Sequence, residues 1–499
     1  MSKKSEKNII FGLLNQLVVI IFGLLLPRMF ITSYGSEING LVSSVNQIYT
    51  YVALLEAGVG TASLQALYKT IANDDINETN SVLSATHRFY KRTGILYFLS
   101  VILISILYPL IVKSNIPTIT IVLVILFNGL GGVVNYFFQG KYRILLRAEG
   151  KNYVLSNLST VIYFLTNAAK IVLILFGFDV AIVTLSHFII NLLQMSFIML
   201  YIKKNYKWID LKVKPNNDAI SSKNSVMIHQ ISNLVFSNTD ILILTLVSGL
   251  KDVSVYSLYN SFFTICKSIL FSFLDGVQYA LGQTFNSDFE KFKEIQERFE
   301  SLYMVLTFMI YSVLYAVISP FIAIYTRGIS DANYIDKYIP LLFTLVYLLQ
   351  GARGPMQLVS EYAQHFKQTQ HQAIIEMVIN LSVTIISVLK FGIYGVLFGT
   401  IAALLYRANA IIIYTNKIIL KKSPFGTYKR WGWCFVVFLI IYFILESINI
   451  NIKSYVSLTL FAIPVAIIIV ILYIVGMFIF ERKSLLYLLE ILKNKLRIK

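Results

Sequence analysis

The stretch that decides the fold class is YVSLTLFAIPVAIIIVILYIVGMFIF, residues 455–480, which carries no charged side chain. It is longer than the about 20 apolar residues that an α-helix needs to cross the hydrocarbon core of a membrane. The whole chain of 499 residues has the same character, with 57% hydrophobic and 14% charged residues. Soluble domains are only about 45–50% apolar and about 25% charged. The sequence therefore predicts a polytopic membrane protein.

Fourteen apolar runs along the chain predict an all-α protein with fourteen transmembrane helices. The predicted ranges are 8–33, 38–68, 94–112, 118–138, 154–176, 180–202, 226–249, 254–281, 302–325, 338–363, 373–390, 393–416, 431–448 and 455–480. Some ranges nearly touch, so the turns between them must be tight. The loops on the side opposite the N-terminus are short and leave no room for a soluble domain.

The distribution of basic residues predicts the orientation of the chain. The 43 Lys and Arg residues exceed the 25 Asp and Glu residues, for a net charge of +18. Most of the basic residues fall in the loops on one side, and the positive-inside rule places that side and both termini in the cytoplasm. The densest patches, 203–214, 417–430 and 493–499, suit anionic lipid head groups or a partner enzyme. The apolar content excludes nucleic acid as a ligand.

An internal repeat with an offset of about 220 residues is visible in the sequence. Pro117 and Pro340 each open a span, and Phe176-Gly177-Phe178 corresponds to Phe391-Gly392-Ile393 at a tight turn. Six helices in each copy make the copies parallel repeats, as in alternating-access carriers. The predicted domains are a six-helix lobe over 1–203, a second over 221–417, an additional helix pair over 431–480 and an amphipathic cytoplasmic tail over 481–499.

Charged residues within membrane spans are costly, and each one is a functional candidate. The basic candidates are Arg28, Lys170, Lys267, Arg353 and Arg407, and the acidic ones are Glu56, Asp240, Asp275 and Glu376. Separated cations in a cavity suit a phosphate or diphosphate, since Arg offers paired donors and Lys a mobile charge. Arg28, Lys267 and Arg353 are predicted to bind substrate, with Lys170 and Arg407 as further cavity residues. Glu56, Asp240 and Asp275 are predicted to bind a coupling ion or to line the cavity.

Structural explanations compete with these functional ones. Arg28 lies near the outer end of its span and can extend to the membrane interface. Asp240 can be a neutral, hydrogen-bonded acid between helices, and Arg407 can pair with Glu376 of the preceding span. Arg353 lies between Gly351 and Gly354-Pro355, where the sequence predicts an irregular helix beside a cavity.

Four segments together resemble a known family. They are Leu26-Pro27-Arg28 through Gly40-Leu41, Leu54-Leu55-Glu56-Ala57-Gly58-Val59, Phe137 to Lys151, and Asn238-Thr239-Asp240-Ile241-Leu242-Ile243. Their order and spacing resemble the Wzx-type polysaccharide flippases of the multidrug/oligosaccharidyl-lipid/polysaccharide exporter superfamily. One departure is Glu56, where the family pattern has a neutral residue or Asp.

The resemblance implies a V-shaped pair of lobes with a cationic central cavity. It implies transport of an undecaprenyl-diphosphate-linked oligosaccharide to the outer leaflet of the bacterial cytoplasmic membrane, coupled to H⁺ or Na⁺. Family cavity positions correspond to Arg28, Glu56, Asp240, Lys267 and Asp275. It also implies that the last two helices help to form a groove for the lipid tail. Expected partners are membrane lipids and the polysaccharide polymerase and glycosyltransferases of surface-polysaccharide synthesis.

Two other functions compete with this interpretation. A multidrug exporter of the same superfamily would usually have twelve spans and an acid-rich cavity. A membrane polysaccharide polymerase or glycosyltransferase would need larger outer loops, so an enzyme is disfavoured. Cys266 and Cys434 lie within apolar runs and give neither a disulfide framework nor a metal cluster, and no cofactor is expected.

Overall fold

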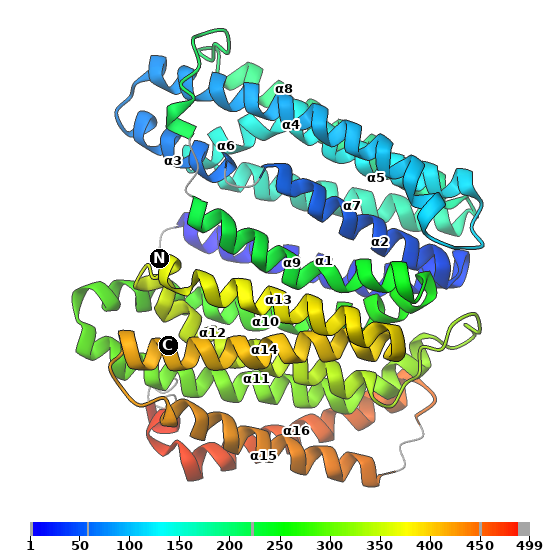
Figure 1. Cartoon of the computed structure of the whole chain (residues 1–499), viewed down its shortest axis with the longest axis vertical. Coiled ribbons are helices and arrows are strands. Elements are labelled where there is room, and N and C mark those ends of the chain that lie inside the picture. The colour runs from blue at the N-terminus through cyan, green and yellow to red at the C-terminus, as the bar shows by residue number, and fades with distance from the viewer. Residues whose placement is uncertain (1–2, 57–58, 221–223, 449–451, 488–499) are drawn as a thin grey trace. The chain divides into compact units, whose positions relative to one another are not determined.

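The computed structural model describes residues 3–56, 59–220, 224–448 and 452–487 and is all-helical (Figure 1). Within these ranges there is no β-strand, and nine helices are long and apolar enough to cross a membrane. The chain is therefore a multi-pass α-helical membrane protein. It divides into two compact units, Met1–Ser254 and Val255–Lys499, and the division falls inside the long helix α10 (Leu250–Ser287).

A ring of five helices forms the centre of the N-terminal unit. Contacts run from α1 (Lys3–Tyr34) to α2 (Ser36–Val52), α5 (Thr118–Val134), α8 (Val180–Asn205) and α7 (Asn152–Leu175), and from α7 back to α1. The remaining elements are η1 (Ala53–Glu56), α3 (Val59–Ala72), α4 (Ile76–Ile111), η2 (Asn135–Gln139), α6 (Gly140–Ala148), η3 (Asp218–Ile220) and α9 (Asn224–Val247). Of these, α4 packs on α5, and α9 packs on α2.

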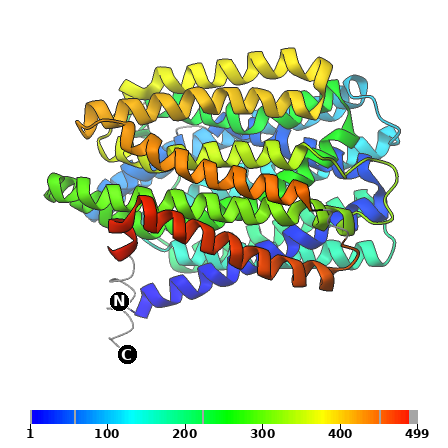
Figure 2. The same ribbon diagram turned by 90° about the horizontal axis from the view of Figure 1, so that it is seen from below.

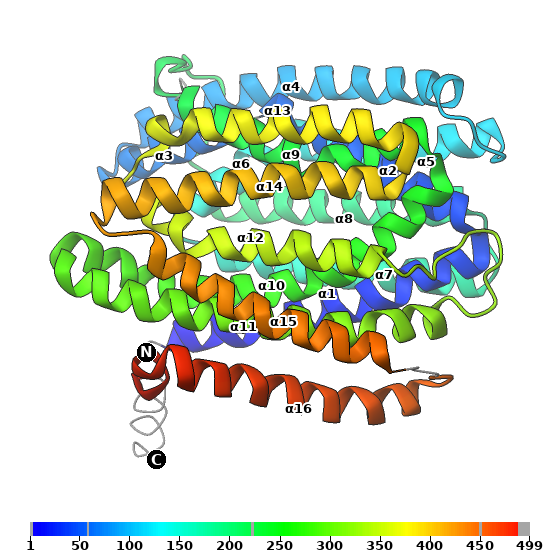
Figure 3. The same ribbon diagram turned by 60° about the horizontal axis from the view of Figure 1, so that its bottom comes forward.

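The C-terminal unit is built as a succession of packed helices. Contacts run from α13 (Phe366–Phe391) to α14 (Ile393–Tyr414), α12 (Ile339–Tyr362) and α11 (Phe289–Tyr325). A π-helical turn, η4 (Thr415–Ile419), extends α14. α11 then contacts both α15 (Phe425–Ser447) and α16 (Tyr455–Phe480). Within this unit, α13 and α16 lie on opposite sides (Figures 2 and 3).

Each predicted span is helical apart from its end residues, with one correction. The range 38–68 is not a continuous helix, because α2 ends at Val52 and α3 begins only at Val59. A 3-10 turn follows α2, and two glycines, Gly58 and Gly60, stand close to the break; glycine has a low helix propensity. The number of fourteen membrane crossings stays a prediction.

Local signals explain how several helices begin and turn. Asp75, Asp179 and Asp288 each accept a backbone hydrogen bond at the start of a helix, which is the usual role of an N-cap aspartate. The predicted tight turns at Gly177 and Gly392 are confirmed, with φ of 75° and 52°. Such positive φ values are cheap only for glycine.

The predicted lobe boundaries at 1–203, 221–417 and 431–480 stay a prediction. The compact N-terminal unit ends after Ser254 and includes α9, the first helix of the second predicted lobe. Of the predicted tail over 481–499, residues 482–487 are helical, and 488–499 lie outside the described residues.

Candidate functional site

Three charged residues meet inside the C-terminal unit. Arg353 of α12 donates from Nη1 to Oε1 of Glu376 on α13, with 2.5 Å between the two atoms. Nε of Arg407 on α14 lies 3.4 Å from Oε2 of the same carboxylate. The expected pairing of Arg407 with Glu376 is thus confirmed. Arg353 shares this partner, which the sequence did not predict.

The three side chains can meet because they lie at one level of the unit. α12 ends at Tyr362, α13 begins at Phe366 and α14 ends at Tyr414, so these three helix ends belong to one end of the unit. At a rise of about 1.5 Å per residue, each charged residue lies roughly 10–15 Å along its helix from that end. We call this group of Arg353, Glu376 and Arg407 the arginine–glutamate cluster.

The arginine–glutamate cluster has an excess of positive charge. The side chain of Glu376 is 3% exposed, that of Arg407 7% and that of Arg353 14%. Arg407 also donates from Nη1 to Oε1 of Gln372, 2.9 Å away. Two guanidinium groups thus share one buried carboxylate within the cluster.

Lys267 of α10 adds a positive charge beside the cluster. Its side chain is exposed, and its ammonium group interacts electrostatically with the guanidinium of Arg353. Lys267 and Arg353 are therefore the more accessible cations, whereas Arg407 is the more buried one and holds Glu376 and Gln372.

The predicted helix irregularity at Arg353 is wrong, because α12 is continuous from Ile339 to Tyr362. The glycine before Arg353 has a packing role instead. A Cβ atom on Gly351 would lie 2.3 Å from Cγ2 of Thr307 on α11. Glycine at this position therefore allows α11 and α12 to approach closely, two residues before Arg353 in the chain.

In the N-terminal unit, Glu56 is part of a separate polar group. Its carboxylate accepts a hydrogen bond from the hydroxyl of Tyr90 on α4 and interacts electrostatically with Arg143 on α6. Tyr90 and Arg143 were not predicted, because the sequence does not show which faces of η1, α4 and α6 meet. The departure at Glu56 from the family pattern thus coincides with a tyrosine and an arginine that accommodate a carboxylate.

The other predicted residues occupy several places. Asp240 on α9 is 5% exposed and lies near Tyr51 of α2, whose hydroxyl contacts Thr239. Arg28 is half-buried near the end of α1.

Lys170 lies on α7 beside His187 of α8. Asp275 lies on α10, and its side chain is outside the described residues. The structure therefore brings together Lys267, Arg353 and Arg407, whereas Glu56 and Lys170 make their contacts with different helices.

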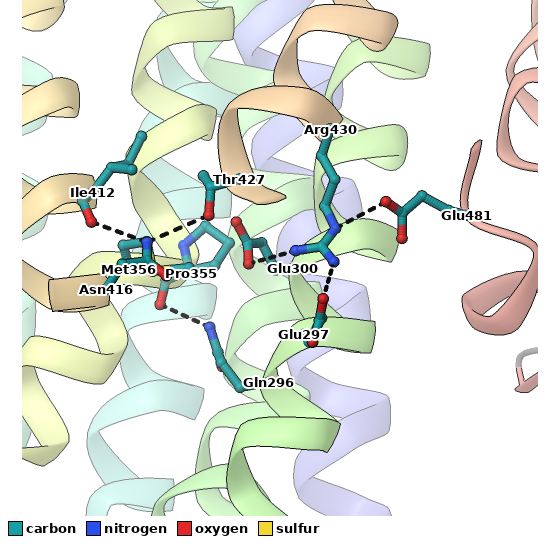
Figure 4. Close-up of polar contacts among 10 residues, drawn as sticks. All are labelled: Gln296, Glu297, Glu300, Pro355, Met356, Ile412, Asn416, Thr427, Arg430 and Glu481. Carbon is teal, nitrogen blue, oxygen red and sulfur yellow. Dashed lines mark hydrogen bonds and ion pairs between the residues drawn. The ribbon is translucent and has the colours of Figure 1, made fainter. Parts of the chain in front are cut away.

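A second buried ion-pair group lies where α15 and α16 meet α11 (Figure 4). Arg430 of α15 contacts Glu300 and Glu481 at 3.1 Å each and Glu297 at 2.5 Å. Its side chain is 6% exposed. The interpretation of 417–430 as a basic patch for lipid head groups or a partner enzyme is therefore wrong for Arg430, which connects the helix pair α15–α16 to α11.

Near Arg430, neutral polar contacts fasten α12 to its neighbours. The amide of Gln296 on α11 donates to the backbone oxygen of Pro355, and that of Asn416 in η4 lies 3.6 Å from Sδ of Met356 (Figure 4). These contacts fix α12 one turn beyond Arg353. The part of α12 that follows Arg353 is therefore attached to both α11 and η4.

No protein-family model matches the sequence, and no curated protein matches it significantly. Solved structures of similar fold do match. The lipid II flippase MurJ in an inward closed conformation has a TM-score of 0.69 and 14% sequence identity, over 95% of this chain and 99% of MurJ. The chain has the fold of MurJ.

The fold is also that of the MATE transporters. An inward-facing multidrug resistance MATE family transporter of the MOP superfamily has a TM-score of 0.66 at 14% identity, over 81% of this chain and 95% of that one. The Vibrio cholerae MATE transporter VcmN has a TM-score of 0.52 at 14% identity, over 82% of this chain and 95% of VcmN. The likeness to MurJ thus extends over more of this chain than the likeness to the MATE transporters.

Proposed function

We propose that this protein is a flippase for a lipid-linked oligosaccharide. It moves an undecaprenyl-diphosphate-linked oligosaccharide from the cytoplasmic to the outer leaflet of a bacterial cytoplasmic membrane by alternating access, coupled to H⁺ or Na⁺. Glycosyltransferases would supply this substrate, and a polymerase would use the product to build a surface polysaccharide such as O-antigen or capsule. In this proposal both termini lie in the cytoplasm.

The observation that carries the proposal is the arrangement of Lys267 and Arg353 beside Glu376. A guanidinium group binds phosphate oxygens through two parallel hydrogen bonds, and a lysine adds a mobile point charge. The diphosphate of the lipid carrier has the charge and the oxygen atoms that these two cations bind. Glu376 competes with the diphosphate for Arg353, and this competition favours release as well as binding.

The remaining residues have supporting roles in the proposal. Arg407 holds Glu376 when the diphosphate displaces it from Arg353. Arg28, Asp240 and Asp275 are proposed to line the cavity, and Glu56 keeps its proposed cavity role together with Tyr90. The pair α15–α16 is proposed to receive the lipid tail, because Arg430 fixes it against α11 and both helices expose large apolar side chains, among them Ile440 and Ile467.

A multidrug exporter is the second candidate function, and the likeness to MATE transporters favours it. The charge of the arginine–glutamate cluster favours the first candidate instead. Cationic drugs are repelled by Lys267 and Arg353, whereas a diphosphate is attracted. The likeness to the MATE transporter covers 81% of this chain and the likeness to MurJ covers 95%. A lipid substrate also has a tail that the helix pair α15–α16 can bind.

Reconstituted vesicles provide the test of the proposed function. Fluorescent undecaprenyl diphosphate is added to the membrane, and its appearance in the other leaflet is measured by quenching. The wild type should transfer the probe, and Arg353→Ala should lose transfer. Lys367→Ala, which removes an exposed cation from the same end of α13, should transfer normally. Transport of a cationic dye, without transfer of the diphosphate lipid, would favour the multidrug exporter.

A further inference from the structure

Hydroxyl and amide side chains of α10 and α12 form a small hydrogen-bonded group inside the C-terminal unit. The hydroxyl of Tyr347 on α12 donates to Oδ1 of Asn260 on α10, 2.7 Å away. The same hydroxyl lies 2.9 Å from Oγ1 of Thr264, which is one turn further along α10. We call Asn260, Thr264 and Tyr347 the amide–hydroxyl group. It lies one to two turns before Lys267 on α10.

The register of α10 and α12 places this group beside the two cations proposed to bind the diphosphate. The contact of Thr264 with Tyr347 joins positions 83 residues apart, and the hydrogen bond from Tyr362 to the backbone oxygen of Gln278 joins positions 84 residues apart. The two helices therefore run side by side in the same direction, with Lys267 level with residues 350 and 351. At a rise of about 1.5 Å per residue, Thr264 lies roughly 5 Å along α10 from Lys267, and Tyr347 roughly 9 Å along α12 from Arg353.

The amide–hydroxyl group lies on the accessible face of α10. Asn260, Thr264 and Lys267 are four and three positions apart, so they share one face of the helix. Thr264 and Lys267 are exposed and Asn260 is half-buried. The adjacent positions Tyr259 and Phe263 are 0% exposed. A molecule bound at Lys267 therefore meets the polar side chains of this face and not the aromatic ones.

Tyr347 sets the direction of the hydrogen bonds. A tyrosine hydroxyl has one proton, and Tyr347 gives it to Asn260. The contact with Thr264 is then a hydrogen bond only if the threonine hydroxyl donates. Thr264 consequently offers the lone pairs of Oγ1 as acceptors, while Asn260, whose oxygen binds Tyr347, offers its amide nitrogen as a donor. A donor and an acceptor thus stand one turn apart on the same face.

The position of Tyr347 is itself fixed by aromatic packing. Its ring centroid lies 5.3 Å from that of Phe263 and 5.5 Å from that of Tyr311 on α11. Tyr347 is 5% exposed. The amide–hydroxyl group is therefore held in place before any ligand arrives, and less conformational entropy is lost on binding.

Gln350 supplies a further acceptor at the level of Lys267. It lies one turn after Tyr347 and one turn before Arg353. Its Oε1 atom is buried and has no hydrogen-bond partner among the residues that the structure describes. A buried acceptor without a donor is rare and costly in folded proteins, and a hydroxyl group of a ligand can satisfy it.

We propose that the amide–hydroxyl group and Gln350 form a sugar subsite. Neighbouring hydroxyl groups of a sugar ring can each donate and accept a hydrogen bond. One of them accepts from the amide nitrogen of Asn260, and others donate to Oγ1 of Thr264 and Oε1 of Gln350.

The sugar subsite rests on the proposed function. The first sugar of a lipid-linked oligosaccharide is bonded directly to the diphosphate. A diphosphate held by Lys267 and Arg353 therefore brings this sugar to the amide–hydroxyl group. The two sites together recognise the linkage between the lipid carrier and the oligosaccharide.

The affinities of the purified, full-length protein for two lipids test the subsite. The probes are undecaprenyl diphosphate and undecaprenyl diphosphate-glucose, which differ only in the sugar. The wild type should bind the glucosylated lipid at least about tenfold more tightly, because each hydrogen bond contributes about two- to tenfold in affinity. Thr264→Val and Gln350→Leu should each lower this affinity ratio about two- to tenfold. Thr264→Ser, which keeps the hydroxyl, should retain the wild-type ratio.

Ser261→Ala is the matched control on the same helix. The hydroxyl of Ser261 donates to the backbone oxygen of Ser257 at 2.7 Å, so its removal should leave the ratio unchanged. An equal fall of the ratio in Ser261→Ala and Thr264→Val would overturn the assignment to the amide–hydroxyl group. Equal affinity of the wild type for the two lipids would overturn the sugar subsite and leave the diphosphate site standing. Binding of neither lipid would contradict the proposed function, and the subsite with it.

Discussion

The guanidinium of Arg353 is bound to the carboxylate of Glu376, 2.5 Å from Nη1 to Oε1, while its side chain keeps 14% of its surface exposed. Arg353 is thus paired and accessible at once. Arg407 lies on the other side of the same carboxylate and is more deeply buried. An anion that approaches Arg353 therefore meets a cation whose present partner can stay behind with Arg407.

The first prediction concerns this asymmetry. Arg353→Ala should weaken binding of undecaprenyl diphosphate by at least about tenfold, because a charge-assisted hydrogen bond contributes about 1.5–3 kcal/mol. Glu376 keeps Arg407 as its partner, so the variant should fold and reach the membrane. Fluorescence titration of purified protein measures the affinity, and size-exclusion chromatography checks the fold. Unchanged affinity in a folded variant would remove Arg353 from the site.

The second prediction concerns the competitor. Glu376→Gln removes the carboxylate that occupies Arg353, so the affinity for undecaprenyl diphosphate should rise. The same change removes the ion pairs of Glu376 with Arg353 and Arg407, and the melting temperature without ligand should fall. Thermal unfolding with and without the lipid measures both effects, and the stabilisation by the lipid should exceed that of the wild type. A loss of affinity would mean that Glu376 helps to bind the substrate.

The third prediction concerns the attachment of α15 and α16. Arg430→Met leaves the carboxylate of Glu300, 1% exposed, without its partner. Removing one member of a buried ion pair costs about 3–5 kcal/mol, whereas an exposed pair contributes about 0–1 kcal/mol. Thermal unfolding should therefore show a large loss for Arg430→Met and little change for Arg298→Met, which breaks the outer pair with Glu294.

Addition of Glu300→Leu to Arg430→Met supplies a further control. An apolar side chain at this buried position removes the unpaired charge, and stability should be partly restored. Equal stability of Arg430→Met and Arg298→Met would show that the buried group contributes no more than a surface pair does.

Much of the fold could be predicted because membrane helices are marked by length and apolarity alone. The break after Val52 was not predicted, since the apolar run continues through Gly58 and only the glycines indicate it. The pairing of Arg407 with Glu376 was predicted because the two residues lie on consecutive spans. Hydropathy identifies charged residues within spans but not the direction in which each side chain points. The ion pair of Arg353 with Glu376 was therefore not predicted.

Arg430 shows a second limit of the sequence. Its neighbours in the chain are basic, and this local composition suggests an exposed patch. Its partner Glu300 is 130 positions away and belongs to α11. Neither residue lies in a predicted span, so the rule that singles out intramembrane charges passed over both.

The fourth prediction concerns the turn between α13 and α14. Gly392 has φ 52° and ψ −124°, a conformation that is strained for residues with a Cβ atom. Gly392→Ala should therefore lower stability by about 1–2 kcal/mol. Gly432 lies within α15, and a Cβ atom there would meet no atom within 4 Å. Gly432→Ala should leave the melting temperature equal or raise it, because alanine favours a helix by about 1 kcal/mol over glycine. Similar losses in both variants would contradict this explanation.

The last prediction concerns the segment after α8, residues 206–217, which is bound to the start of α4. The side chain of Asn80 donates to the backbone oxygen of Trp208 at 3.1 Å, and that of Ser84 donates to the backbone oxygen of Val213 at 2.9 Å. These bonds hold Lys212 and its neighbours in a backbone conformation that trypsin cannot use, since cleavage requires local opening.

Asn80→Ala and Ser84→Ala should each raise the rate of tryptic cleavage in this segment about twofold to tenfold. A net hydrogen bond contributes about 0.5–1.5 kcal/mol, and cleavage follows the population of the open form. Mass spectrometry of timed digests measures the rate at Lys207 and Lys212. Ser100→Ala, whose hydroxyl contacts only the backbone of α4, should digest as the wild type does. If all three variants digest at one rate, opening of the segment is governed by other contacts, such as that of Asn216 with Glu78.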